Sequence, residues 1–391
     1  MGIARLFKYP VRLLGAALCC ASVQAQVCKP PDSHLSLPER KLYIVAGQSN
    51  AVGLASIRGV RKNRNAPFLD HAIYPNVKIY GVHGAPPGVA GKDDAAVSRN
   101  VEWSYFAGWR VASPGFGYKN VADGPHLFPF GTRPGDFFGP ELSLARHLNN
   151  QPPRDHYIAK LAVGNASLNY SSSADNWMPT SHLYNELLKL IADAHNSKRE
   201  IVRLRVSGMF FMQGETDALN QAWSRNYEKS LFDFITSIRR DLKHMGCSDQ
   251  EEFPVVVGRI QDNPVWVHRK YVRAGQQEAA RKLPLISVID TDDFASHLVP
   301  DGIHFNEYAQ NQLGTRVYRA LEELTLQGRA RSLVRKDPSR GQFAGGGTNG
   351  VEFSEYCCLA ASSSSPSLQR FLPRTYTHDG VCQGRICTSL Y

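Results

Sequence analysis

The segment KLYIVAGQSNAVG, residues 41–53, carries the clearest signal of the fold. Its first six residues form a short apolar run rich in β-branched side chains, and Gly47 and Gly53 permit tight turns after it. A strand that is apolar on both sides is typical of a parallel sheet whose two faces are both covered. The stretch therefore predicts a buried strand that delivers Ser49 and its polar neighbours to the edge of a sheet.

The same pattern recurs along the chain as far as about Leu326. Four more runs read as strands: HYIAKLAV (156–163), VRLRVSGMFFMQ (202–213), PVVVGRI (254–260) and LISVID (285–290). Helical patterns lie between them, at ELSLARHL after Gly139 and Pro140, and at 183–195, 219–244, 265–282 and 307–325. This alternation with short links predicts an α/β protein, a three-layer α/β/α sandwich with a mostly parallel sheet. Ligands of such sheets bind at the carboxyl ends of the strands.

Two regions depart from this rhythm. Residues 55–138 are rich in glycine, proline and aromatic residues without a steady period, so we interpret them as a long insertion of ordered loops over the mouth of the sheet. Each ring there could face substrate or simply pack the loop onto the domain. Residues 327–391 turn basic, then rich in glycine and serine, and contain four cysteines, which favours a linker followed by a small disulfide-stapled appendage.

The N-terminus has the features of a secretory signal. Basic residues, an apolar stretch at 13–23 and small residues follow in that order, so we expect a signal peptide at 1–25, cleavage after Ala25 and a short extension at 26–40. The remaining cysteines would then be exposed to an oxidising compartment, where an even number indicates disulfides rather than metal. They are Cys28, Cys247, Cys357, Cys358, Cys382 and Cys387, and their pairing is left open. The protein is expected to be secreted, to the periplasm or the extracellular space.

The composition of the 391 residues is that of an ordinary globular protein, with 42% hydrophobic and 20% charged residues. No apolar run reaches the roughly 20 residues that cross a bilayer, so no membrane span is expected. Because Arg5, Lys8 and Arg12 leave with the signal, the formal net charge falls from +10 to +7. This modest excess fits a basic solvated face and slightly favours an anionic substrate. No nucleic-acid partner, cofactor or metal is expected.

Ser49 is the candidate nucleophile. A serine at the tip of a buried strand, next to glycines, can expose its hydroxyl for attack on a substrate. The surrounding residues do not form the G-x-S-x-G elbow of many hydrolases. A serine after a strand also serves as a helix N-cap, so this segment alone leaves both roles open.

A candidate base lies in PDGIHFNEYAQ, residues 300–310, between the last predicted strand and the last helix. Asp301 and His304 are three residues apart, so one turn can hold the carboxylate behind the imidazole while Nε2 faces Ser49. A serine hydroxyl needs such a base at neutral pH. Without Ser49, a plain turn at Asp301 and a space-filling His304 would be the better interpretation.

Two more segments follow predicted strands and could stabilise an oxyanion. In FMQGETD (211–217) the side-chain amide of Gln213 is a candidate donor, and Glu215 could orient loops, bind substrate hydroxyls or cap the next helix. In AVGNASLNY (162–170) Gly164 lets a backbone N–H approach a tetrahedral intermediate, although a plain turn uses glycine as well. We expect all of these segments to meet at one mouth of the sheet.

Six short blocks resemble those of the SGNH hydrolases, in particular the carbohydrate acetylesterase branch that includes sialate O-acetylesterases and acetylxylan-type esterases. The blocks are GQSN (47–50), GPEL (139–142), the Gly164 segment, SHLYN (181–185), QGETD (213–217) and DGIH (301–304). The resemblance covers residues 41–326. It implies a flavodoxin-like α/β/α fold, a metal-independent serine esterase and an O-acetylated sugar as substrate.

The resemblance also assigns roles. It implies Ser49 as the nucleophile, His304 as the base and Asp301 as the partner of the base. It implies three oxyanion donors: the backbone N–H of Ser49, Gly164 and Gln213. The expected substrate-binding residues are Gln48, Asn50, Asn165 and Glu215. Asn165 is a departure, because the branch usually has a second glycine there.

These observations predict a secreted serine esterase that removes O-acetyl groups from sialic acid or from a plant or bacterial polysaccharide. Two alternatives stay open at this point. One is a catalytically silent carbohydrate-binding protein on the same scaffold, and the other is an SGNH esterase of the lipase type that prefers long acyl chains.

Overall fold

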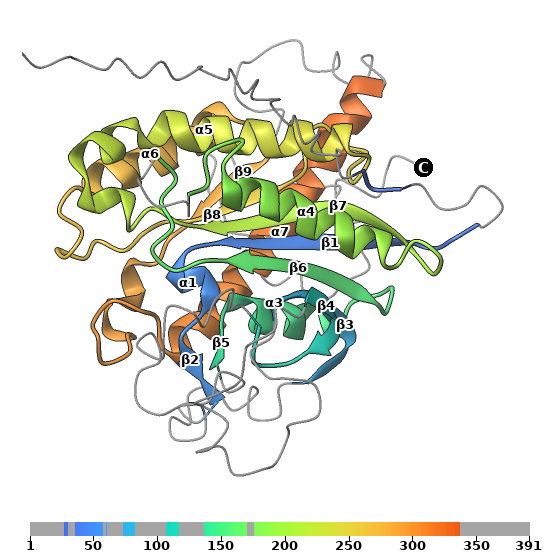
Figure 1. Ribbon diagram of the computed structural model, residues 1–391, viewed down its shortest axis with the longest axis horizontal. Helices are drawn as coiled ribbons and strands as arrows, with labels where there is room; N and C mark the ends of the chain where they lie inside the picture. The colour runs from blue at the N-terminus through green and yellow to red at the C-terminus, as the bar shows by residue number, and fades with distance from the viewer. Residues whose placement is uncertain are drawn as a thin grey trace, which may run out of the picture.

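The computed structural model describes residues 27–29, 36–57, 60, 73–82, 107–116, 137–169 and 176–336. Its centre is a seven-stranded sheet in the order β4-β3-β6-β1-β7-β8-β9 (Figure 1). The strands are β1 (Glu39–Gly47), β3 (Tyr74–Val82), β4 (Ala107–Ala112), β6 (His156–Ala162), β7 (Arg203–Met212), β8 (Val255–Gly258) and β9 (Ile286–Ile289). Neighbouring strands are parallel, except that β3 and β4 are antiparallel. A small second sheet pairs β2 (Ala55–Ser56) with β5 (Phe137–Phe138).

Helices cover both faces of the central sheet. They are α1 (Ser49–Val52), α3 (Pro140–Asn149), α4 (His182–Asn196), α5 (Gln221–His244), α6 (Arg269–Lys282) and α7 (Glu307–Lys336), with short 3-10 helices η5 (Asp217–Leu219) and η6 (Asp292–Ser296). Figure 1 shows α4 and α5 on one side of the sheet and α3 on the other.

Two hydrophobic cores result from this layering. Ile44 and Phe211 pack into the core beneath α4, α5 and α6, whereas their neighbours Val45 and Phe210 pack into the core shared with α3 and α7. Successive side chains of a strand point to opposite faces, so a strand buried on both faces must be apolar throughout. The predicted three-layer α/β/α sandwich with a mostly parallel sheet is confirmed.

The five strands predicted from apolar runs are all present, and α3, α4 and α5 begin and end within about two residues of the prediction. Helix α6 begins at Arg269, four residues later than predicted. Residues 263–268 form turns in which the Asn263 side chain accepts the N–H of Val265. This local side-chain hydrogen bond favours a turn where the prediction placed the first turn of the helix.

Two strands of the central sheet were not predicted. The interpretation of residues 55–138 as loops only is wrong for β3 and β4, which extend the sheet beyond β6. Pro75 and Gly81 interrupt the β3 sequence YPNVKIYGV, and its register with β4 shifts between Tyr74 and Lys78. Proline and glycine are depleted in strand interiors and tolerated at sheet edges, so the strand signal here is weak.

Helix α7 extends beyond the predicted end of the esterase domain. The predicted domain ended at residue 326, whereas α7 continues without a break to Lys336. The basic residues that suggested a linker lie in this final part of the helix, where Arg and Lys are good helix formers. The rest of the expected appendage, with its four cysteines, lies outside the described residues.

A disulfide joins Cys28 to Cys247, across 219 residues of sequence. The backbone N–H of Cys28 donates to Met245 O (2.8 Å), and the N–H of Lys29 donates to the Asn196 side chain (2.8 Å). The segment before β1 is thereby attached to the ends of α4 and α5. The expected signal peptide lies outside the described residues, and within them no helix is long and apolar enough to span a membrane.

Candidate active site

The register of three adjacent strands gathers the predicted segments at one edge of the sheet. Gly47, the last residue of β1, is paired with Ala162 at the end of β6 and with Met212 at the end of β7. The residues that follow these three ends are therefore neighbours in space. Helix α1, which begins with Ser49, stands at this edge (Figure 1).

The turn that carries Ser49 requires glycine at position 47. Gly47 has φ +137°, and a Cβ atom there would lie 1.9 Å from the carbonyl oxygen of Met212. The N–H of Gln48 donates to the same carbonyl oxygen (2.8 Å), so the chain turns tightly against β7. Ser49 follows as the half-buried first residue of α1. Among the described residues neither its N–H nor its hydroxyl has a hydrogen-bond partner.

Asp301 holds the ring of His304. The Nδ1 atom of His304 is 2.6 Å from Asp301 Oδ2, while Asp301 Oδ1 accepts the N–H of Ile303 (2.8 Å) and of His304 (3.0 Å). Partial burial alone would raise the pKa of Asp301, but these hydrogen bonds outweigh it and lower the pKa. Asp301 is therefore ionised at neutral pH, and its carboxylate fixes the proton on Nδ1 and leaves Nε2 as the basic nitrogen.

Asn50 connects the turn of Ser49 with the loop of His304. Its Oδ1 accepts the N–H of Phe305 (3.0 Å), and its backbone carbonyl accepts a hydrogen bond from Gln310 Nε2 (3.1 Å). Residues directly adjacent to Ser49 and to His304 are thus hydrogen-bonded to each other. The Ser49 hydroxyl does not hydrogen-bond His304 in this conformation, and such bonds often form only when substrate is bound.

Gln213 lies behind this edge. Its side chain is fully buried, and Nε2 faces Gln48 Oε1 (3.3 Å), Ala166 O (3.2 Å) and Asp217 Oδ2 (2.5 Å). An amide has two N–H bonds, and these acceptors occupy both. The geometry therefore does not support Gln213 as an oxyanion donor, since its amide holds the loops that surround the site.

Three of the four residues expected to bind substrate are likewise buried. Gln48 is 3% exposed, and its Oε1 accepts the N–H groups of Gly214 (3.2 Å) and Thr216 (3.4 Å). Asn50 is 1% and Glu215 is 3% exposed, and Asn50 Nδ2 donates to Glu215 Oε1 (3.2 Å). These contacts support the site from within and leave no side-chain surface for a sugar.

Gly164 and Asn165 are exposed at the end of β6. Nothing lies within 4 Å of a Cβ atom built on Gly164, and the Gly164 N–H has no partner among the described residues. Asn165 has φ +59°, a left-handed conformation that asparagine tolerates better than most residues. This segment is open to solvent at the edge of the sheet, and the expected roles of both residues stay a prediction.

Sequence reasoning missed the residues that hold the site together. The Tyr227 hydroxyl donates to the Gln213 backbone carbonyl (2.7 Å), and Gln276 Nε2 donates to the same oxygen (3.1 Å). Asp217 accepts the N–H groups of Leu168 (2.8 Å) and Asn169 (3.0 Å), which ties the β7 loop to the β6 loop. Asp217 lies inside the QGETD block and could have been noticed there. Tyr227 and Gln276 lie within α5 and α6 and carry no local signal.

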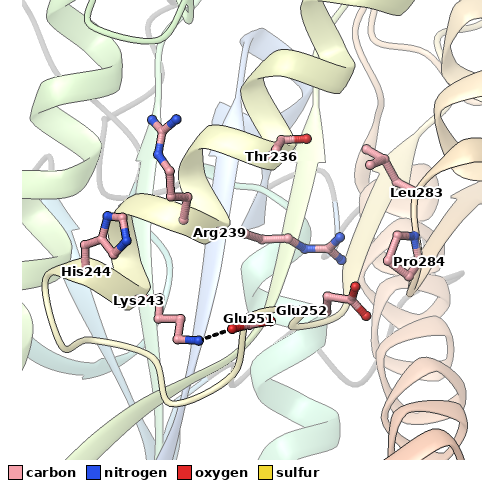
Figure 2. A pocket seen from close by; sticks show the side chains of 9 residues that line it. Thr236, Arg239, Lys243, His244, Glu251, Glu252, Leu283 and Pro284 are labelled. Carbon is pink, nitrogen blue, oxygen red and sulfur yellow. Dashed lines mark hydrogen bonds and ion pairs between the residues drawn. The ribbon is translucent and has the colours of Figure 1, made fainter.

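A cavity of about 360 Å³ lies elsewhere, at the end of α5 and before the first residues of β8 and β9 (Figure 2). Two of its basic side chains are already engaged: Lys243 pairs with Glu251, and Arg239 donates to the carbonyl of Phe253 (2.6 Å). This is the amino end of the strands, opposite the edge that carries Ser49. Within the described residues no group of three or more His, Cys, Asp or Glu side chains is arranged to hold a metal ion.

A three-layer α/β/α fold, with a serine turn and an aspartate-held histidine at the carboxyl edge of its sheet, is the arrangement that the resemblance to the SGNH hydrolases implies. Residues 109–323 match the family model described as carbohydrate esterase, sialic acid-specific acetylesterase, and the chain belongs to this family. It is therefore a carboxylic ester hydrolase that removes O-acetyl groups from carbohydrate. The resemblance seen in the sequence is confirmed.

Solved structures agree with the fold. NanS shares 18% identity with a TM-score of 0.52, and the match covers 75% of this chain and 98% of NanS. A protein from Arabidopsis thaliana shares 18% identity with a TM-score of 0.50, and the match covers 73% of this chain and 99% of that protein. A search of the curated proteins finds no match.

Proposed function

We propose that this carbohydrate esterase is an exported serine hydrolase that deacetylates O-acetylated sialic acid through an acetyl-enzyme. The observation that carries the mechanism is the 2.6 Å contact between Asp301 and His304, on a loop that Asn50 ties to the turn of Ser49. The family description and the modest positive charge both favour an acidic sugar.

In the first half-reaction, Ser49 Oγ attacks the acetyl carbonyl carbon while His304 Nε2 takes the hydroxyl proton. Asp301 keeps the ring oriented and stabilises the imidazolium that forms. The N–H groups of Ser49 and Gly164, which have no partner among the described residues, are the proposed donors to the oxyanion. Collapse of the tetrahedral intermediate breaks the bond to the sugar oxygen, which takes the proton from His304 and leaves as the free hydroxyl.

In the second half-reaction, water attacks the acetyl group on Ser49. His304 Nε2 takes a proton from the water, and collapse of the second tetrahedral intermediate returns that proton to Ser49 Oγ and releases acetate. All proton transfers use one ring nitrogen, which is why the carboxylate must hold the other.

Replacement of Ser49 tests the mechanism. Ser49→Ala should abolish hydrolysis of p-nitrophenyl acetate without loss of the circular dichroism spectrum of the folded protein. Ser207→Ala is the matched control, because Ser207 lies within β7 and donates only to the Arg205 carbonyl (3.0 Å). Turnover retained by Ser49→Ala would refute the assignment of the nucleophile.

A substrate panel tests the specificity. Acetate release should be fastest from O-acetylated sialic acid and slower from acetylated xylan and acetylated pectin, with Ser49→Ala as the blank. Faster release from either polysaccharide would replace the proposed substrate and leave the mechanism intact. A preference for octanoate over acetate esters would support the lipase-type alternative, and sugar binding without acetate release would support a silent binding protein.

Export is supported by the disulfide. The Cys28–Cys247 bond joins buried cysteines, and such structural disulfides persist in oxidising compartments. Fractionation of expressing cells should recover the active protein outside the cytoplasm, with an N-terminus that begins after Ala25.

A further inference from the structure

The Asn50 carboxamide has a forced orientation. Phe305 presents a backbone N–H, which can only donate, so the carboxamide oxygen must face it, as observed at 3.0 Å. The carboxamide nitrogen must then face the other way, where Glu215 Oε1 accepts its hydrogen bond at 3.2 Å. An ionised carboxylate can only accept, so Glu215 permits this orientation and excludes the flipped one.

The Glu215 carboxylate is buried, and Asn50 is the side chain that donates a hydrogen bond to it. Its Oε2 is buried and has no hydrogen-bond partner among the described residues. The ionisable groups that interact with it are His304 on the base loop, Asp217 on its own loop and Tyr227 on α5. Burial raises the pKa of Glu215, while a hydrogen bond from its own backbone N–H, the Asn50 hydrogen bond and the charge of His304 oppose that rise.

Asn50 is therefore the contact through which Glu215 can act on the catalytic residues. Asn50 directly follows Ser49, and Phe305 directly follows His304. A carboxamide that flips or swings would break the bond to Phe305, and the loop of His304 would be free to move relative to the turn of Ser49. Displacements of about 1 Å between reacting groups can slow an enzyme about 100-fold.

We propose that Glu215, through Asn50, is a positioning residue of the esterase: it holds the Asn50 carboxamide in the orientation that locks the loop of His304 to the turn of Ser49. The inference rests on the proposed function. Because Asn50 and Glu215 are buried away from substrate, their replacement should lower kcat and leave KM within about twofold.

A reciprocal exchange of the two side chains tests the proposal. In Asn50→Asp two carboxylates face each other, so kcat should fall about 100-fold or more. In Glu215→Gln the new amide can still accept from Asn50, so kcat should fall only a fewfold. In the double variant Asn50→Asp/Glu215→Gln the direction of the hydrogen bond is reversed, one carboxylate remains, and Phe305 keeps its acceptor. The double variant should therefore recover kcat at least tenfold over Asn50→Asp.

Ser143→Ala is the control for a purely structural effect. It removes a buried hydrogen bond to Asn311 (3.0 Å) between α3 and α7, so it should lower the melting temperature and leave kcat unchanged. A double variant no faster than Asn50→Asp, at equal foldedness, would overturn the proposal.

The proposed function and the positioning role of Glu215 fail under different results. If the wild-type protein releases no acetate from any ester, the proposed function fails. The urea unfolding midpoints of the wild type, the two single variants and the double variant are then compared instead. Recovery of the unfolding midpoint in the double variant would still establish the Asn50–Glu215 coupling, and no recovery would refute it. If the wild type is active and only the exchange fails, the positioning role alone is wrong.

Discussion

Lys160 and Glu141 form an ion pair of 2.6 Å in which neither side chain has any exposed surface. Lys160 Nζ also donates to the carbonyl oxygens of Val52 (2.8 Å) and Phe116 (3.2 Å), and Glu141 accepts the N–H of Gly139 (3.0 Å). The pair thus joins the middle of β6 to the end of α1, the helix that begins with Ser49. Burial lowers the pKa of Lys160, and the charge and hydrogen bond of Glu141 oppose that effect.

Replacing one residue of the Lys160–Glu141 pair should greatly lower the free energy of unfolding. Lys160→Met leaves the Glu141 carboxylate buried without a counter-ion, which costs about 3–5 kcal/mol of unfolding free energy. The measurement is urea denaturation at neutral pH. Lys189→Met is the matched control, because the Lys189–Asp193 pair on α4 is exposed and should contribute less than about 1 kcal/mol. Equal losses in the two variants would contradict the prediction.

The disulfide should contribute strongly to stability, because it closes a loop of 219 residues. The chain-entropy model gives roughly 5 kcal/mol for a loop of this length, by restricting the unfolded chain. The double variant Cys28→Ser/Cys247→Ser should therefore unfold at a much lower urea concentration than the oxidised wild type. Wild-type protein treated with a reductant should match the variant, and an unchanged midpoint in both would count against the effect.

Two glycines at the site should differ sharply in their tolerance of a methyl group. Gly47→Ala places Cβ 1.9 Å from the Met212 carbonyl oxygen at φ +137°, so the turn of Ser49 must move. We expect a loss of about 3 kcal/mol or more and a large loss of esterase activity. Gly164→Ala meets nothing within 4 Å, so it should fold with the melting temperature of the wild type, and its rate then reports only how closely substrate approaches this N–H. Melting curves and initial rates of both variants check this contrast.

The fold could be predicted to the extent that its signals are local. KLYIVA and most of the other apolar runs are buried on both faces of the sheet, so their composition alone marks them as strands. Strand β3 lies between β4 and β6, and only β4 is at the edge. Pro75 lies where the β3–β4 register is irregular and before the first β3–β6 pair, and with Gly81 it makes β3 look like a loop by composition. The sequence does not predict the last part of α7, because the change to basic residues after 326 resembles a linker.

In the candidate site, too, contacts between residues close in sequence could be predicted, and contacts between distant residues could not. The Asp301–His304 contact spans three residues of one loop, so spacing alone predicts it. The bond between Asn50 and Phe305 spans 255 residues and has no local signature. Gln213 was expected to face the substrate because it follows a strand, but Asp217, four residues later, takes its amide inward. The hydrogen-bond partner of such a polar side chain depends on loop geometry, which a short motif does not encode.

The pH dependence of stability should reveal the buried carboxyl group of Glu215. Burial raises its pKa above the value of 4.5 expected in the unfolded chain. Between these two pKa values the folded protein binds more protons than the unfolded chain, so this group lowers the stability of the fold as the pH rises through that window. Glu215→Gln removes the titration. The melting temperature of the variant minus that of the wild type should therefore increase as the pH rises above about 4.5. Glu278→Gln is the control, because Glu278 is exposed on α6 and the hydrogen bond from Arg281 lowers its pKa, which reverses the sign. A difference that stays constant or decreases with rising pH in Glu215→Gln would mean that this carboxyl group ionises as easily in the folded protein as in water.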